Sequence, residues 1–178
     1  MKTTVVLILL AAAASPTLAA PYNNHVDIGV LGFFIGNYGA HYERNLNDYF
    51  SVRAGGSFMP AFASIYHPDN EESIASWVVF QTTVGGAFWP LGGFRRLFVM
   101  AEMGTDFHSV KSESGDTGSA VALRPGALIG WRWVIADRAT LTLGGGSDYI
   151  SVHAKAGDEE GVWTGIWPRA EFGLGYLF

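Results

Sequence analysis

The sequence predicts an all-β fold: an eight-stranded antiparallel up-and-down barrel that spans a membrane. Apolar and polar residues alternate with a period of two along most of the chain, which is typical of strands, and helical periodicity is nearly absent. Short turns alternate with longer polar connections, and the last alternating strand ends on the terminal residue, Phe178. Beyond the N-terminal region no stretch is apolar enough for a membrane-spanning helix, so any crossing has to be made by strands.

The first residues have the features of an export signal. Lys2 supplies a positive charge, residues 3–14 are apolar, and small residues follow up to Ala19. The apolar stretch is shorter than the roughly 20 residues that a membrane-spanning helix needs, which disfavours an uncleaved anchor. We therefore expect a signal peptide over residues 1–19 and a barrel domain over residues 20–178.

Composition excludes two other classes of protein. With 11 Lys and Arg against 16 Asp and Glu, the chain is acidic and a poor candidate for binding nucleic acid through its phosphates. It has no cysteine, so the disulfides that often support small exported domains cannot stabilise it. Its 178 residues fit a single domain, whose stability is then expected to come from the closed barrel itself.

The alternation places eight strands near residues 26–35, 38–45, 49–64, 75–90, 96–109, 120–134, 139–153 and 162–178. The first two are also compatible with one long strand over residues 26–45, which would give seven strands. A break at Gly36 and Asn37 restores the even number that single-chain bacterial barrels have, and it places both chain ends in the periplasm. We therefore predict eight strands.

The connections alternate in length. Short turns are expected over residues 45–48, 91–94 and 135–138, and longer polar segments over residues 65–74, 110–119 and 154–161. Outer-membrane barrels have short periplasmic turns and longer extracellular loops, so the long segments are candidates for contact with an extracellular ligand. Two of these loops are rich in carboxylates, but neither has the spacing or the glycine of a calcium loop, so we predict no metal site and no cofactor.

The last strand shows a clear division of faces. Apolar side chains lie on one face, and charged or small residues lie on the other: Ala170, Phe172, Leu174, Tyr176 and Phe178 against Arg169, Glu171, Gly173 and Gly175. A strand between lipid and a polar lumen requires this division, and it recurs in the neighbouring strands. In the alternative, a soluble sandwich or lipocalin-like barrel, the apolar face would point inward.

The tryptophans lie near the predicted strand ends. Indole prefers the interface between membrane and water, so two aromatic belts are expected. One comprises Trp77, Trp163 and Trp167 near the long loops, and the other comprises Trp89, Trp131 and Trp133 near the short turns. Tryptophans scattered through a core are the alternative.

Charged side chains fall on the face that points into the lumen. The predicted cluster comprises Glu43, Arg53, Glu102, Asp106, Arg124, Arg132, Asp148, Arg169 and Glu171. The estimated register places Asp148 almost opposite both Arg124 and Arg169, and Glu43 within diagonal reach of Arg53. A buried charge is tolerated only when it is paired, and eight strands enclose an interior just wide enough for side chains. We therefore predict a plugged, salt-bridged lumen, with a gated or proton-responsive channel as the alternative.

Some outer-membrane barrels are lipid-modifying enzymes with a histidine, a serine and a carboxylate near the outer rim. Two sets match by residue type: His108 with Ser109 and Asp106, and His153 with Ser151 and Asp148. A nucleophile needs its base within hydrogen-bond reach, and residues two apart on a strand share a face. Ser109 points away from His108, and Asp148 lies on the face opposite to His153. We predict no catalytic residues, with a lipid A-modifying hydrolase that uses partners from another strand as the alternative.

The end of the chain resembles a known pattern. The residues Glu171-x-Gly173-x-x-Tyr176-x-Phe178 resemble the C-terminal β-signal of outer-membrane proteins. This resemblance implies that the barrel assembly machinery recognises the last strand. Residues 34–44 and 50–53 resemble the opening of a group of small bacterial outer-membrane barrels of unknown function. The overall architecture is similar to that of the enterobacterial adhesion and invasion family.

The sequence thus predicts an integral barrel of the Gram-negative cell outer membrane, in contact with outer-membrane lipids and lipopolysaccharide. The plugged lumen and the acidic extracellular loops favour a structural or surface-interaction role. A lipid-modifying enzyme, a narrow channel or small-ligand transporter, and a soluble periplasmic barrel are the alternatives.

Overall fold

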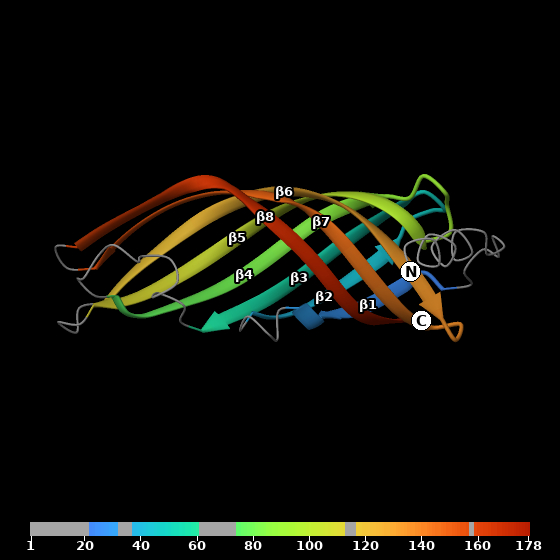
Figure 1. Cartoon of the computed structure of the whole chain (residues 1–178), viewed down its shortest axis with the longest axis horizontal. Coiled ribbons are helices and arrows are strands. Elements are labelled where there is room, and N and C mark those ends of the chain that lie inside the picture. Colours follow the sequence, from blue (N-terminus) through green and yellow to red (C-terminus); the bar gives the residue numbers. More distant parts are fainter. Residues whose placement is uncertain (1–21, 32–36, 61–73, 113–116, 157–158) are drawn as a thin grey trace, which may run out of the picture.

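The computed structural model describes residues 22–31, 37–60, 74–112, 117–156 and 159–178. They form the strands β1 (Asn24–Gly29), β2 (Tyr38–Asn45), β3 (Phe50–Pro60), β4 (Ile74–Phe88), β5 (Arg96–Ser112), β6 (Thr117–Ile135), β7 (Ala139–Ala156) and β8 (Glu159–Leu177). Each strand is antiparallel to its neighbours, and β8 pairs with β1 to close the barrel (Figure 1). The predicted all-β, eight-stranded up-and-down barrel is confirmed.

The first two strands determine whether the barrel has seven strands or eight. β1 ends at Gly29, and β2 begins at Tyr38 and pairs antiparallel with it, so the chain makes two strands here rather than one. The strand predicted over residues 26–35 is shorter than expected, because Val30 and Leu31 adopt a helical conformation. In the described part of the chain, no helix is long and apolar enough to cross a lipid bilayer.

Two of the longer connections are shorter than predicted. β5 extends to Ser112 and β6 starts at Thr117, while β7 extends to Ala156 and β8 starts at Glu159. Much of the two segments predicted as loops is therefore strand, because antiparallel pairing continues beyond the point where the side chains become polar. The predicted signal peptide lies outside the described residues, as does nearly all of the loop predicted between β3 and β4.

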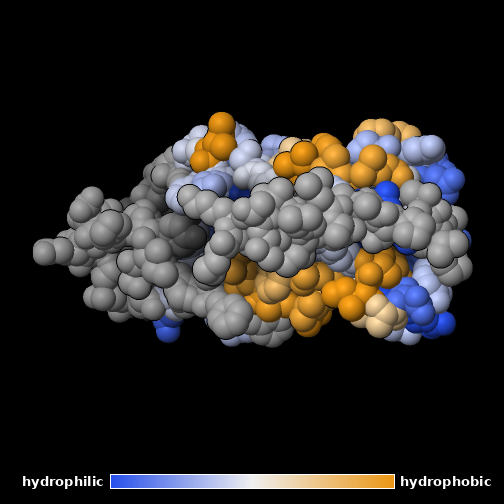
Figure 2. All heavy atoms as spheres, turned by 45° about the vertical axis from the view of Figure 1, so that its right-hand side comes forward, coloured by the Kyte–Doolittle hydropathy of each residue, from blue (hydrophilic) through white to orange (hydrophobic). Residues whose placement is uncertain are grey.

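Apolar side chains lie on the outside of the barrel, and charged side chains point inward. In β5, for example, Val99, Met103 and Phe107 are exposed, whereas Glu102 and Asp106 are buried. Figure 2 shows hydrophobic residues gathered on the side of the barrel and hydrophilic residues at its end. A soluble barrel has the opposite arrangement, with its apolar face packed on the core.

The wall of the barrel is uneven in height. The ladder between β6 and β7 stops at Gly126 and Asp148, although both strands continue, and the next residue of β6 is Pro125, which has no N–H to donate. The ladder between β1 and β8 stops at Gly29 and Gly173, although β8 continues far beyond it. Among the described residues, the outer half of the β7–β8 hairpin therefore pairs only with itself, and Figure 1 shows it projecting as a separate ribbon.

Gly146 on β7 is a position where the wall has no room for a side chain. A Cβ there would lie 2.0 Å from the backbone oxygen of Ala127 on β6, whereas a Cβ at Gly145 would meet nothing closer than 3.9 Å. We expect Gly146→Ala to lower the free energy of unfolding by about 1–3 kcal/mol, as overpacking does, and Gly145→Ala to change it little. Urea unfolding in detergent micelles, followed by tryptophan fluorescence, measures both; equal effects would contradict this close packing.

Candidate functional site

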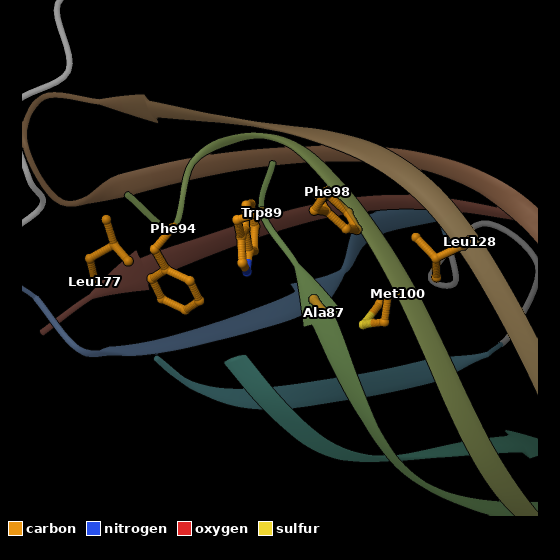
Figure 3. Close-up of a cluster of buried hydrophobic side chains, with 7 residues drawn as sticks. All are labelled: Ala87, Trp89, Phe94, Phe98, Met100, Leu128 and Leu177. Carbon is orange, nitrogen blue, oxygen red and sulfur yellow. The ribbon is translucent and has the colours of Figure 1, made fainter. Parts of the chain in front are cut away.

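An aromatic plug fills the lumen at the end of the short turns. It consists of Ala87, Trp89, Phe94, Phe98, Met100, Leu128 and Leu177, all buried (Figure 3). The ring centre of Trp89 lies 5.3 Å from that of Phe94 and 5.0 Å from that of Phe98. Phe94 belongs to the turn between β4 and β5, where its positive φ of 57° is uncommon for a bulky residue. This turn therefore contributes a ring to the closure of the barrel end.

Arg132 joins the plug to the polar part of the lumen. Its guanidinium lies 4.8 Å from the ring centre of Trp89 and 4.9 Å from that of Phe94, within the range of cation–π attraction. Its Nη2 lies 2.6 Å from a carboxylate oxygen of Glu43. The hydroxyl of Ser51 donates to the same carboxylate and accepts a 2.9 Å hydrogen bond from Nε1 of Trp89. The buried charge is thus both paired and stacked.

An ion-pair network crosses the lumen beside the plug. It links Asp27, Arg53, Glu171, Arg169, Asp148, Arg124 and Asp106 in that order, with Glu102 attached to Arg169. Arg53 lies 3.2 Å from Asp27 and 2.9 Å from Glu171. The two contacts predicted for Asp148 are present, at 2.5 Å from Arg124 and 3.5 Å from Arg169. Because its members come from β1, β3, β5, β6, β7 and β8, the network ties different parts of the wall together.

Glu43 and Arg53 form different pairs from the one predicted. They stand directly opposite each other in the ladder between β2 and β3, yet Glu43 binds Arg132, and Arg53 binds Asp27 and Glu171. An arginine side chain is long enough to reach across a narrow lumen. The partners of these two residues therefore lie on strands that are not their neighbours, where register between neighbouring strands gives no information.

Three interior residues of the first two strands were missed from the sequence: His25, Asp27 and His41. Nδ1 of His41 lies 3.0 Å from a carboxylate oxygen of Asp27, and Nε2 of His25 lies 2.7 Å from the hydroxyl oxygen of Thr140. The alternation held the necessary signal, because His25 and Asp27 are buried while the intervening Val26 is exposed. The predicted strand began one residue too late to include His25.

Glycines on neighbouring strands make room for the charged side chains. A Cβ at Gly126 would lie 1.9 Å from a carboxylate oxygen of Asp148, and a Cβ at Gly104 would lie 3.0 Å from Nη2 of Arg124. Eight strands enclose little more volume than the inward side chains occupy. A large side chain on one strand therefore requires a very small residue beside it on the next.

The prediction of two tryptophan belts is wrong for three of the six residues. Trp77 and Trp89 are buried, at 8% and 0% exposure, and Trp167 lines an internal cavity. The alternation of β4 and β8 places these three on the same face as the charged residues, whereas the belt prediction considered only height along the barrel. Trp131 and Trp133 lie on the outer face of β6, with ring centres 6.3 Å apart. The side chain of Trp163 lies outside the described residues.

The residues of the C-terminal pattern divide between the two faces. Glu171 and Gly173 point inward, and Glu171 belongs to the ion-pair network, whereas Tyr176 and Phe178 are exposed on the outer face. The backbone of Phe178 exchanges two hydrogen bonds, of 3.1 and 2.9 Å, with that of Asn24. The last residue therefore closes the seam between the two ends of the barrel domain.

The candidate catalytic sets are not assembled as triads among the described side chains. Nδ1 of His108 accepts a 3.0 Å hydrogen bond from Nε1 of Trp77. Asp106 is held by an arginine of the ion-pair network, and Ser109 lies on the exposed outer face. The side chain of His153 lies outside the described residues. The three described members of the first set therefore do not contact one another as a triad would require.

A cavity of about 330 Å³ lies on the loop side of the ion-pair network. Five members of the network form its floor: Asp106, Arg124, Asp148, Arg169 and Glu171. Its walls include Met59, Trp77, Val79, His108 and Trp167. Within the described ranges, no group of three or more metal-ligating side chains is present. Among the described residues, the lumen is thus filled toward the short turns and hollow toward the loops.

No protein-family model matches the chain, no curated protein is significantly similar to it, and no solved structure matches it. The function of this barrel therefore has to be inferred from its own residues and geometry.

Removal of Arg132 is expected to destabilise the barrel, because Glu43 would stay buried and charged without its partner. Breaking one side of a buried pair costs about 3–5 kcal/mol, whereas apolar replacement of both partners is often neutral. We expect Arg132→Leu to lower the free energy of unfolding by that amount and Arg132→Leu/Glu43→Leu to recover most of it. Urea unfolding in micelles tests this; a double variant as unstable as the single one would refute pairing as the cause.

Proposed function

We propose that this chain is an integral outer-membrane β-barrel of a Gram-negative bacterium, exported by its N-terminal signal peptide. The polarity of the barrel is the observation that supports this most strongly, with apolar side chains outside and charged ones inside. In lipid, this arrangement places the apolar side chains of the wall against the hydrocarbon and keeps the charges away from it. In water, it would expose an apolar surface far larger than monomeric soluble proteins tolerate.

The length of the ladders also suits a bilayer. β6 and β7 pair over ten residues of each strand. A tilted transmembrane strand needs roughly nine to eleven residues. The paired part of this wall is therefore long enough to cross the hydrocarbon, and the remaining hairpin would extend beyond it.

The role that we propose is structural or surface-interacting rather than pore-forming. The aromatic plug and the ion-pair network form two successive closures of the lumen. Contacts with other molecules would then be made by the wall, which faces outer-membrane lipids and lipopolysaccharide, and by the acidic loop end. The C-terminal strand, with its resemblance to the β-signal, would be the segment recognised by the barrel assembly machinery.

Membrane location is tested by fractionation of cells that express the protein. We expect recovery in the outer-membrane fraction, release only by detergent, and faster gel migration before boiling than after it, because a closed barrel resists detergent denaturation. A protein found in the soluble fraction with the same migration before and after boiling would overturn the proposal.

Closure of the lumen is tested in planar bilayers that contain the purified barrel. We expect no steady conductance, because the described lumen is blocked by the plug and by paired side chains. As a control, an open porin is inserted into a separate bilayer to show that the measurement detects channels. Stable single-channel steps from the protein, absent from a mock preparation, would contradict a closed lumen.

A further inference from the structure

The cavity on the loop side of the ion-pair network has the chemistry of a binding site. We propose that it binds a neutral, medium-length amphiphile, whose oxygen accepts a hydrogen bond from Nε2 of His108 and whose alkyl chain packs on the apolar wall. The cavity volume of about 330 Å³ is at the lower end of the roughly 300–1,000 Å³ typical of small-molecule sites. Such a site goes beyond a structural or surface-interaction role.

His108 presents a hydrogen-bond donor to this cavity. The residue is 7% exposed, and its Nδ1 accepts a hydrogen bond from the indole N–H of Trp77. Since indole can only donate, Nδ1 carries no proton, and the neutral imidazole carries its proton on Nε2. Among the described residues, this buried Nε2 has no hydrogen-bond partner. A buried donor without an acceptor is destabilising, so the site is suited to a ligand that brings one.

The charges around the cavity select a neutral ligand. Its floor consists of two arginines, Arg124 and Arg169, and three carboxylates, those of Asp106, Asp148 and Glu171, and both arginines are already paired. A carboxylate head would meet this excess of negative charge. An ammonium head would be attracted to the floor, but it offers no acceptor to Nε2 of His108. A hydroxyl or ester oxygen satisfies both conditions.

The wall of the cavity suits an alkyl chain. Trp77, Val79 and Val110 form a buried apolar cluster, and Met59 packs against it. Trp77, Val79 and Met59 also line the cavity, next to His108. Apolar walls with a few placed polar groups are typical of sites that bind and orient small amphiphiles.

The lining of the cavity also includes a segment of β8. This segment contains Pro168, Ala170 and Phe172, which alternate along β8 with the inward Arg169 and Glu171. These residues lie where β8 continues beyond its ladder with β1. Pro168 has no N–H, so this edge of β8, which has no partner strand among the described residues, leaves no backbone donor unpaired at that position.

The proposal is tested with the exported protein in phosphatidylcholine nanodiscs, titrated with ω-bromodecanol, whose bromine quenches tryptophan fluorescence on contact. Trp77 and Trp167 line the cavity, so we expect a saturable component of quenching in addition to the linear one from partition into lipid. His108→Phe should weaken the apparent affinity about tenfold, the value of one hydrogen bond. Ser109→Ala, on the outer face of the same strand, is the matched control and should leave the affinity unchanged.

Two further variants keep the test independent of folding defects. His108→Gln retains an N–H donor and should retain binding, whereas Val79→Phe narrows the apolar wall and should abolish the saturable component. The heat-dependent gel shift verifies that each variant is folded. Quenching that never saturates, or that is the same in wild type and in folded Val79→Phe, would overturn the site.

The chemical class of the ligand is tested with two analogues. Bromodecane lacks the oxygen and should bind about tenfold more weakly than ω-bromodecanol. Bromodecanoate should also bind more weakly, because its negative charge is repelled by the carboxylates of the floor. Bromodecane binding as tightly as the alcohol would exclude the hydrogen bond to His108. Equal or tighter binding of bromodecanoate would exclude selection for a neutral head.

Discussion

Charge pairing inside a narrow lumen is the constraint on which the rest of this barrel depends. Eight strands enclose just enough space for side chains, so an inward charge has to be neutralised by another residue instead of by bulk water. The ion-pair network meets this demand by connecting Asp27 on β1 with Asp106 on β5 through residues of other strands. Its attractions therefore act across the barrel and support closure as a whole. Glu171 and Asp148 each contact two arginines, whereas Asp106 has only Arg124 as its ion-pair partner among the described residues, so the members of the network depend on one another to different degrees.

The same lack of space explains where the lumen is filled and where it is hollow. Beside the large charged residues, glycines such as Gly126 provide the missing volume. Toward the short turns, Trp89, Phe94 and Arg132 stack on one another and leave no passage. Toward the loops, the ladder between β6 and β7 and the ladder between β1 and β8 end before the strands do. The strands therefore no longer surround one shared set of interior side chains. The cavity is the result of this difference in height between parts of the wall.

The sequence was sufficient for the fold and for the face that each strand turns inward, because both follow from a local period of two. It was sufficient for the contacts of Asp148, which join neighbouring strands, but not for Glu43, which binds Arg132 instead of Arg53 because long side chains also meet across the barrel. The prediction for Trp89 was wrong for another reason. The alternation along its strand indicates that it points inward, but the belt prediction used only its nearness to a strand end. The position of the cavity depends on where the ladders end. Of these ends, only the one next to Pro125 is indicated by a residue type in the sequence.

The division of the lumen limits what an occupant of the cavity can do. The aromatic plug and Arg132 separate it from the turn end, and Glu43 holds Arg132 in place from a fully buried position. A ligand bound next to His108 would therefore leave on the loop side of the plug, where it arrived, unless these paired and stacked groups were disrupted together. Binding and release on the loop side of the ion-pair network are compatible with that geometry. Passage through the barrel would require breaking the buried pair that stabilises its closed end.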